Sequence, residues 1–383
     1  SPYRHLLVDE FQDISEGRAR LLRALKGQHS DGRVFAVGDD WQSIYRFTGS
    51  DIHLMRSFGK EFGGNFAGAD DVHSTVDLGR TFRSVDKIAH PARRFVLRNP
   101  SQIKKTVVPA GTASAPAIMV AYYGWGQDGA ALNGALDRLS AEALSGASVL
   151  LLGRYHRAKP KALAALSANF PKLSIRFMTV HASKGLEADH VIILRAVSDT
   201  MGFPSEVVDD PLLDLVLPEP ENFEHAEERR LFYVALTRAR KSVTILADRE
   251  KPSAFVRELV DTPEYEAIEL GEPGIAEHRC HSCGGRMLAQ KAKKGSTYFS
   301  CEHRHLCGQT LKPCNICGGD LPVKDTANPD KMVCSCGAAF AACPECTDGW
   351  LIERRGPRGK FLGCVTYPAC TGTRQLPKAK GAR

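Results

Sequence analysis

The cysteines constrain the fold of this 383-residue chain most strongly, because all 12 of them lie after residue 279. They form three groups: Cys280, Cys283, Cys301 and Cys307; Cys314, Cys317, Cys334 and Cys336; and Cys343, Cys346, Cys364 and Cys370. The first and third groups have identical spacing and are offset by 63 residues, which indicates a repeated module. Cys-x2-Cys turns paired across about 15–20 residues are typical of four-cysteine zinc ribbons.

A disulfide framework is the alternative, since the cysteine number is even. The lack of cysteine in the remainder of the chain favours zinc, so we expect about three Zn²⁺ ions in a string of small modules. The Cys334-x-Cys336 pair is short for a zinc-binding turn, which leaves the ligands of the middle group open. Histidines could substitute in the first group: His281, His303 or His305.

The charge of the chain is concentrated in the same region. From Cys280 to Arg383 there are 16 Lys and Arg against 7 Asp and Glu, a net charge of +9, whereas the rest carries −2. A basic region favours a polyanionic partner such as nucleic acid. Because each Zn²⁺ with four thiolates adds −2, three sites would reduce the charge to about +3. Binding would then depend on where the cations lie.

The first 270 residues alternate short apolar runs with longer amphipathic patterns, which predicts an α/β fold. The expected strands are His5–Val8, Arg33–Val37, Ala117–Ala121, Ser148–Leu152, Ile175–Met178, His190–Leu194 and Val243–Ala247. The expected helices are Arg18–Leu25, Val85–Arg98, Gly129–Leu144, Pro160–Ser167, Glu224–Leu236 and Pro252–Val260. We interpret them as two parallel sheets covered on both faces, divided near Val76–Leu78. No apolar run approaches the ~18 residues that span a membrane, so no membrane partner is expected.

Two adjacent carboxylates, Asp9 and Glu10, follow the first apolar run. The carboxyl end of a parallel strand is where α/β sheets present ligand groups. There, one acid can hold Mg²⁺ while its neighbour orients an attacking water. Without further context, such a pair would lie in a solvated loop more often than in a nucleotide-binding site.

The context of this pair resembles the UvrD/Rep-like superfamily 1 DNA helicases, whose motifs recur here in family order. The matching segments are Asp-Glu-Phe-Gln-Asp (9–13), Val-Gly-Asp-Asp-Trp-Gln-Ser-Ile-Tyr (37–45), Leu-Gly-Arg-Thr-Phe-Arg-Ser (78–84), Met-Thr-Val-His-Ala-Ser-Lys-Gly-Leu-Glu (178–187) and Glu-Glu-Arg-Arg-Leu-Phe-Tyr-Val-Ala-Leu-Thr-Arg-Ala (227–239). They correspond to motifs II to VI.

The resemblance implies an α/β fold of two RecA-like parallel-sheet lobes, the first one partial, followed by tandem four-cysteine zinc ribbons. The implied domains are a first lobe (1–77), a second lobe (78–265), a linker (266–278), ribbons at 279–310, 311–339 and 340–375, and a basic tail (376–383). The last ribbon is similar to those of bacterial type IA topoisomerases, which bind single-stranded DNA.

The resemblance also implies a bound ATP between the lobes. Asp9 would bind Mg²⁺ and Glu10 would act as general base, while Gln42 would sense the γ-phosphate. Arg83 and Arg238 would reach that phosphate from the second lobe. The remaining nucleotide contacts would come from Phe82 stacking on adenine, in place of the usual Tyr, from Glu187 on the ribose, and from Gly185 beside it.

Candidate DNA contacts fall in two places. Tyr45, Phe47 and His181 match family positions near the single strand, although Phe47 could be a core aromatic and His181 a structural histidine. In the third ribbon, basic residues alternate with aromatic ones, a pattern suited to stacking on bases, although it also fits a solvated hairpin. These residues are Arg354, Arg355, Arg358, Lys360, Phe361 and Tyr367.

The sequence contains no Gly-x4-Gly-Lys-Ser/Thr, the loop that cradles phosphates in this family. We expect that loop upstream of Ser1, and we expect this chain as given neither to hydrolyse ATP nor to unwind DNA. Only about 90 residues separate Ser84 from Met178, which is similar to the DNA helicase IV branch.

The resemblance therefore implies the C-terminal part of a 3′–5′ DNA helicase acting on single-stranded and partly duplex DNA, in the bacterial cytoplasm at the nucleoid. DNA repair follows by analogy alone. The alternatives are a non-catalytic single-stranded DNA-binding protein and a helicase–nuclease subunit. The motifs favour an enzyme over the first, and the lack of an acidic nuclease cluster disfavours the second.

Overall fold

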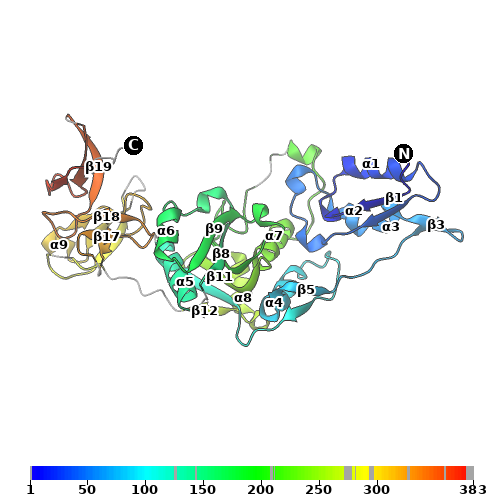
Figure 1. The fold of residues 1–383 in the computed structure, drawn as a ribbon, viewed down its shortest axis with the longest axis horizontal. Coiled ribbons are helices and arrows are strands. Elements are labelled where there is room, and N and C mark those ends of the chain that lie inside the picture. Colours follow the sequence, from blue (N-terminus) through cyan, green and yellow to red (C-terminus); the bar gives the residue numbers. More distant parts are fainter. Residues whose placement is uncertain are drawn as a thin grey trace.

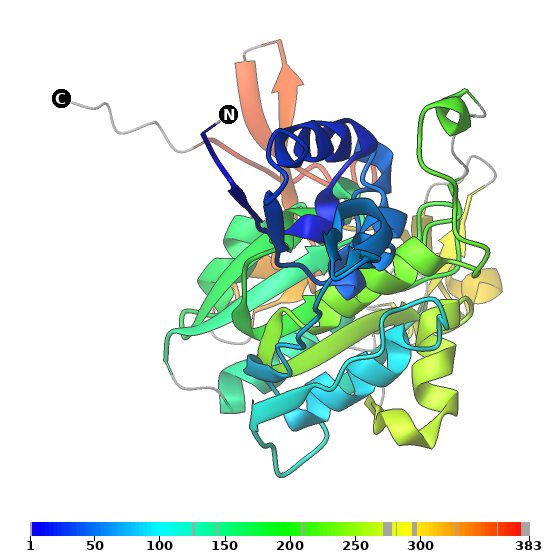
Figure 2. The same ribbon diagram turned by 90° about the vertical axis from the view of Figure 1, so that its right-hand side faces the viewer.

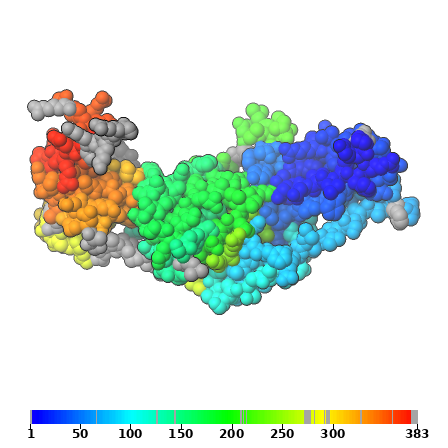
Figure 3. All heavy atoms as spheres, viewed as in Figure 1, coloured from blue at the N-terminus to red at the C-terminus, as the bar shows by residue number. Residues whose placement is uncertain are grey.

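A computed structural model describes residues 2–124, 127–142, 145–207, 210, 212–270, 278–280, 282–292, 297–325, 328–357 and 359–376. Most of the expected linker (271–277), Arg358 and nearly all of the basic tail (377–383) lie outside these residues. The molecule is elongated, with the first lobe at one end, the second lobe in the middle and the cysteine-rich tail at the other end (Figures 1 and 3).

The second lobe is built on a six-stranded parallel sheet with the strand order β12-β7-β11-β10-β8-β9. The strands are β7 (Ile118–Tyr123), β8 (Ala147–Gly153), β9 (Leu173–Thr179), β10 (Ala188–Ile193), β11 (Ala239–Asp248) and β12 (Ile268–Leu270). The apolar runs of the inner strands β7, β8, β10 and β11 are buried on both faces because helices cover both sides of the sheet. β12 lies within the stretch expected to begin the linker.

One face of this sheet packs against α4 (Asp86–Val96), α7 (Ala226–Leu236) and α8 (Ala254–Asp261). The other packs against α5 (Asp128–Glu142) and α6 (Leu163–Asn169). The first lobe lies beside α7, as the two perpendicular views show (Figures 1 and 2). The expected α/β class is therefore confirmed. No helix among the described residues is long and apolar enough to cross a bilayer.

The first lobe has only two core strands, β1 (His5–Val8) and β2 (Arg33–Ala36), which pair in parallel. Helices α1 (Glu16–Lys26), α2 (Ile52–Arg56) and α3 (Phe58–Phe62) accompany them. Leu7 and Phe35 lie directly opposite each other and are 74% and 63% exposed. The expectation that both sheets are covered on both faces is therefore wrong for this sheet, since the described helices bury only one side of it.

Two further strand pairs were not predicted from the sequence. β3 (Gly64–Phe66) and β4 (Ala69–Val72) form a hairpin, and β5 (Arg80–Val85) pairs in parallel with β6 (Val108–Gly111). The segment 73–79, where the two lobes were expected to divide, carries neither helix nor strand.

Motif III joins the two lobes through buried contacts. Trp41 and Ile44 are fully buried in the core that contains α4 and α7, and the Trp41 ring meets Tyr233 edge-on at 5.5 Å. The indole Nε1 donates a hydrogen bond to the Ile103 carbonyl at 3.0 Å. Asp40, also fully buried, accepts one from the Ile103 amide at 2.8 Å. The motif therefore belongs to the core of the second lobe as much as to the first.

Replacing Trp41 with alanine is expected to lower the free energy of unfolding by about 3–5 kcal/mol, because a fully buried ring and its hydrogen bond are lost. Chemical denaturation of the variant would measure this change. Trp41→Phe should cost less, since most of the ring contacts remain. A loss below about 1 kcal/mol for Trp41→Ala would show that motif III does not hold the lobes together.

The tail contains three small antiparallel sheets of three strands each. They are formed by β13 (Met287–Lys291), β14 (Thr297–Cys301) and β15 (Thr310–Leu311), with α9 (Arg304–Cys307); by β16 (Val323–Lys324), β17 (Lys331–Val333) and β18 (Ala339–Ala341); and by β19 (Leu351–Gly356), β20 (Gly359–Cys364) and β21 (Thr373–Arg374).

The three ribbons form the expected string of small modules, and they pack together because they share one apolar cluster. This cluster contains Phe299 of the first ribbon, Met332 of the second, and Trp350 and Val365 of the third. The small size of each sheet explains the sharing, since no single ribbon can bury these side chains alone.

Candidate functional site

Asp9 and Glu10 lie at the carboxyl end of β1, with both side chains exposed. Glu10 adopts a left-handed backbone conformation with φ of 49°. Such a conformation is unfavourable for a residue other than glycine and clusters at functional sites. The Asp9 carboxylate accepts a hydrogen bond from the Glu10 amide at 2.8 Å, which fixes the two acids relative to each other.

A continuous chain of hydrogen bonds connects Glu10 to the second lobe. The buried Gln12 side chain donates to Glu10 at 2.5 Å and accepts from the Asp39 amide at 2.9 Å. The Asp39 carboxylate accepts from Gln42 Nε2 at 2.7 Å. Gln42 Oε1 in turn accepts from Arg238 Nη2 at 3.3 Å. Motifs II, III and VI are therefore physically linked.

Arg238 is held rigidly at the end of this chain. Its side chain is 1% exposed, and its guanidinium also donates to the carbonyls of Val234 and Leu186 at 3.0 and 3.2 Å. Burial lowers the pKa of Arg238 to about 10, and the nearby Arg83 contributes in the same direction. The side chain still carries its charge at neutral pH.

Lys184 of motif V closes the same site from the second lobe. Its ammonium pairs with Glu10 at 3.1 Å and with Asp13 at 2.6 Å. It also lies 5.3 Å from the centre of the Tyr45 ring. Burial raises the pKa of Asp13, although the hydrogen bond from Lys184 opposes that shift.

A hollow of about 450 Å³ lies on the second lobe, lined by Arg80, Thr81, Phe82, Arg83, Glu187 and Arg240. Phe82 is 78% exposed there, beneath the Arg80 guanidinium. Glu187 pairs with Arg240 and, at 3.0 Å, with Arg83. These partners lower the pKa of the Glu187 carboxyl, the Arg240 hydrogen bond most strongly. An aromatic face, a carboxylate and three cations thus share one small space.

Gly185 lies between Lys184 and this hollow along the chain. Its φ of 81° is left-handed, which glycine adopts without steric cost. Here the backbone turns so that Lys184 can meet the first lobe while Glu187 meets Arg83.

Tyr45, Phe47 and His181, the candidate DNA contacts, lie together. The ring centroids are 5.4 Å apart for Phe47 and His181 and 5.9 Å apart for Tyr45 and each of the others. The Tyr45 hydroxyl donates to the His181 carbonyl at 3.1 Å. Phe47 is 58% exposed, whereas burial lowers the pKa of His181 to about 4, so that its ring is neutral at physiological pH.

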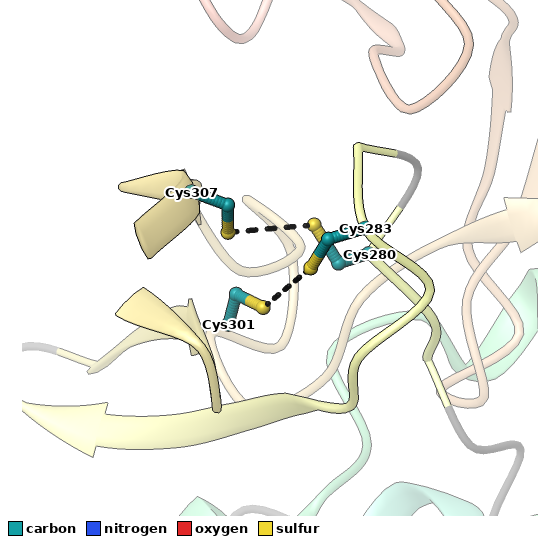
Figure 4. A group of neighbouring side chains, drawn as sticks. All are labelled: Cys280, Cys283, Cys301 and Cys307. Atoms are coloured by element: carbon teal, nitrogen blue, oxygen red, sulfur yellow. Dashed lines mark hydrogen bonds between the residues drawn. The ribbon is translucent and has the colours of Figure 1, made fainter. Parts of the chain in front are cut away.

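The twelve cysteines form three sites, each with four sulfur atoms within 4.8 Å of one another. Figure 4 shows the first, in which the thiols point toward a common centre. The closest Sγ pairs in the three sites are 3.3 to 4.0 Å apart. A zinc tetrahedron with bonds of about 2.3 Å has edges of about 3.8 Å. A disulfide bond of about 2.05 Å is excluded.

These are three zinc-binding sites of four cysteines each, and all four cysteines of the middle group belong to one of them. His303 lies beside the first site, with Nδ1 3.6 Å from Cys283 Sγ, but the four thiols complete the tetrahedron without it.

The described basic and aromatic residues of the third ribbon lie on two faces of its sheet. Arg354 pairs across the sheet with Phe361, and its guanidinium lies 5.4 Å from the Tyr367 ring. Arg355 pairs with Lys360 and therefore faces the opposite side. Arg354 and Arg355 therefore do not share one basic–aromatic face, because alternate residues of a strand point to opposite faces.

Several residues of the site were not singled out from the sequence, among them Gln12, Lys184 and Arg240. All three lie within or beside the motifs. These residues link elements through contacts between segments more than 25 residues apart, such as the Gln12–Asp39 hydrogen bond. Such contacts cannot be predicted from one sequence, because they depend on the tertiary fold.

Comparison with known families agrees with this geometry. The UvrD/REP helicase N-terminal domain matches residues 1–63, and the UvrD-like helicase C-terminal domain matches residues 160–250. These two parts of the chain are similar to the UvrD-like helicases. The topoisomerase DNA-binding C4 zinc finger matches residues 277–304 and 341–379, which lie in the first and third ribbons.

The chain is 43% identical to DNA helicase IV of Escherichia coli over 265 residues, which cover 69% of the chain and 37% of that protein. It is 31% identical to DNA helicase II of Haemophilus influenzae over 114 residues, or 30% of the chain and 14% of that protein. It is also 30% identical to DNA helicase II of Escherichia coli over 114 residues, again 30% of the chain and 14% of that protein. The chain thus spans little more than a third of the length of DNA helicase IV.

Proposed function

We propose that this chain forms part of an ATP-dependent 3′–5′ DNA helicase that moves on single-stranded DNA. The observation that carries the proposal is the hydrogen-bond chain from Glu10 through Gln12, Asp39 and Gln42 to Arg238. It links a strand-end carboxylate to an arginine on another lobe, an arrangement suited to a triphosphate bound between them.

In this proposal, ATP and Mg²⁺ bind at the carboxyl end of β1 against the second lobe. Asp9 holds the metal ion and Glu10 accepts the proton of the attacking water. Glu10 must first leave Lys184, with which it is paired. The hollow beside Phe82 receives the base and ribose. Glu187 then breaks its ion pair with Arg83 and accepts hydrogen bonds from the ribose hydroxyls.

Released from Glu187, Arg83 can join Arg238 at the γ-phosphate. Two guanidinium groups there stabilise charge that develops during phosphoryl transfer. Hydrolysis removes the phosphate that both arginines contact, so the lobes separate again. Alternating closure and opening moves the protein along the strand in the 3′ to 5′ direction, with the strand held against the aromatic group of Tyr45, Phe47 and His181.

DNA, both single-stranded and partly duplex, is the proposed partner. The exposed Phe47 ring supplies a stacking face in the motor, and the Arg354, Phe361 and Tyr367 face supplies another in the tail. The bacterial cytoplasm, at the nucleoid, is the proposed location.

Phe47→Ala tests the DNA site. Loss of one stacking ring is expected to weaken binding of single-stranded oligonucleotides by about 5- to 150-fold, the equivalent of about 1–3 kcal/mol. Fluorescence anisotropy with a short labelled oligonucleotide would measure this change.

Phe82→Ala is the matched control, because it also removes an exposed phenyl ring, here from the proposed nucleotide hollow. It should leave DNA affinity unchanged and weaken ATP binding instead. The DNA site would have to be placed elsewhere if both variants bound DNA as tightly as the unmodified protein.

A further inference from the structure

The middle ribbon differs from its neighbours in what it contacts. The zinc-finger family matches residues 277–304 and 341–379 and leaves most of this ribbon unmatched. Its Cys334-x-Cys336 turn is followed by Gly337, whose φ is 86°. This turn faces the second lobe of the motor, and the space-filling view shows the tail abutting that lobe (Figure 3).

The contact is close. A β-carbon on Gly337 would lie 3.0 Å from the backbone N and Cα of Leu166 in α6, so only glycine fits without displacement. Cys336 lies against Gly129, near the start of α5, at an ordinary packing distance of 3.4 Å from where a β-carbon would be. Ala162, just before α6, packs against the buried Cys314, Cys334 and Ala338 of the ribbon.

The middle ribbon also holds the two outer ribbons. Asp320 accepts a hydrogen bond from His278 at 2.7 Å, which ties in the start of the first ribbon. Asn315 accepts one from the fully buried Trp350 of the third ribbon at 3.2 Å. A contact made by the middle ribbon therefore positions all three.

We propose that the middle ribbon is a docking module, whose metal-built turn at Cys334–Gly337 binds the α5–α6 surface of the second lobe and fixes the entire tail to the motor. Four thiolates on one Zn²⁺ give the turn a rigid shape, and that shape lets Gly337 approach a helix backbone. The dock lies on the face of the sheet opposite α7, away from the first lobe. The tail then moves with the second lobe as one body. This inference does not depend on the proposed helicase activity.

Gly337→Leu and Gly318→Leu test the proposal in the zinc-loaded chain. Both glycines follow a zinc-binding turn in the middle ribbon and both have left-handed φ, 86° and 71°, so the backbone strain is matched. Only the Gly337 substitution meets the second lobe, since nothing lies within 4 Å of a β-carbon on Gly318. Small-angle scattering would report the separation of tail and motor, and hydrogen exchange would report the exposure of α6.

Gly337→Leu is expected to increase the radius of gyration and to speed amide exchange in Leu163–Asn169 by about fivefold or more, with three zinc ions retained. Gly318→Leu should match the unmodified chain. On the motor side, Ala162→Glu should reproduce the effect, and Ala164→Glu, on the exposed side of α6, should not. If Gly337→Leu loses zinc, Ala162→Glu decides alone. If the radius of gyration and the amide exchange of α6 were unchanged in Ala162→Glu, the proposal would be overturned.

Discussion

Replacing Arg238 with alanine is expected to reduce ATP turnover by about 10³- to 10⁵-fold, in a helicase that contains this chain together with a phosphate-binding loop. The guanidinium is buried and fixed by Val234, Leu186 and Gln42, so no neighbouring side chain can replace it. Steady-state kcat for ATP would measure the loss. Arg238→Lys should be nearly as damaging, because one ammonium cannot satisfy three acceptors in different directions.

DNA binding distinguishes this role from a structural one. Arg238→Ala should bind single-stranded DNA within about twofold of the unmodified protein, since Phe47 and Tyr45 do not contact Arg238. Arg240→Ala is the control: it removes an exposed guanidinium two residues away that pairs with Glu187. It should raise the KM for ATP with little change in kcat. Parallel loss of ATP turnover and DNA binding in Arg238→Ala would argue against a role at the phosphate.

Removal of zinc is expected to unfold the tail while leaving the second lobe folded. Structural Zn²⁺ contributes on the order of 10–16 kcal/mol in small cysteine modules, more than such small sheets can supply from packing. The sheet of the second lobe contains no cysteine, so chelation does not reach its core. Circular dichroism during a chelator titration should show loss of the signal from the β-strands of the tail. The thermal unfolding transition of the second lobe should be preserved.

Single cysteine variants test one zinc site at a time. Cys364→Ser should reduce the zinc content measured by elemental analysis from three ions to two, because one thiolate of four is lost. Ser335→Ala is the matched control between Cys334 and Cys336, since it removes only the hydrogen bond to Asp320. It should retain three ions. If Cys364→Ser also retained three zinc ions, the third site would have to bind its metal through other residues.

The positions of the buried parallel strands followed directly from the sequence, since uninterrupted apolar runs such as Ser148–Leu152 lie in strands buried on both faces. The zinc sites could also be predicted from the sequence, because the spacing of the cysteine ligands along the chain reflects local geometry. The short helices α2 and α3 were not predicted, since neither is long enough to show a helical repeat.

What the sequence could not reveal were relations between distant segments. Whether Arg354 and Arg355 share a surface depends on strand register, which pairs them with Phe361 and Lys360 respectively. The partnership of Glu10 with Lys184 depends on how two lobes meet. Burial of Trp41 in the core of the other lobe likewise follows from tertiary packing, not from local propensity.

The bare side of the β1–β2 sheet has a practical consequence for handling this polypeptide. Leu7 and Phe35 form an exposed cross-strand apolar pair, on a sheet that has two strands among the described residues. Surfaces of this kind recruit other copies. A purified sample should bind hydrophobic dyes and sediment as larger species when concentrated, and a Phe35→Lys substitution should improve its colloidal behaviour.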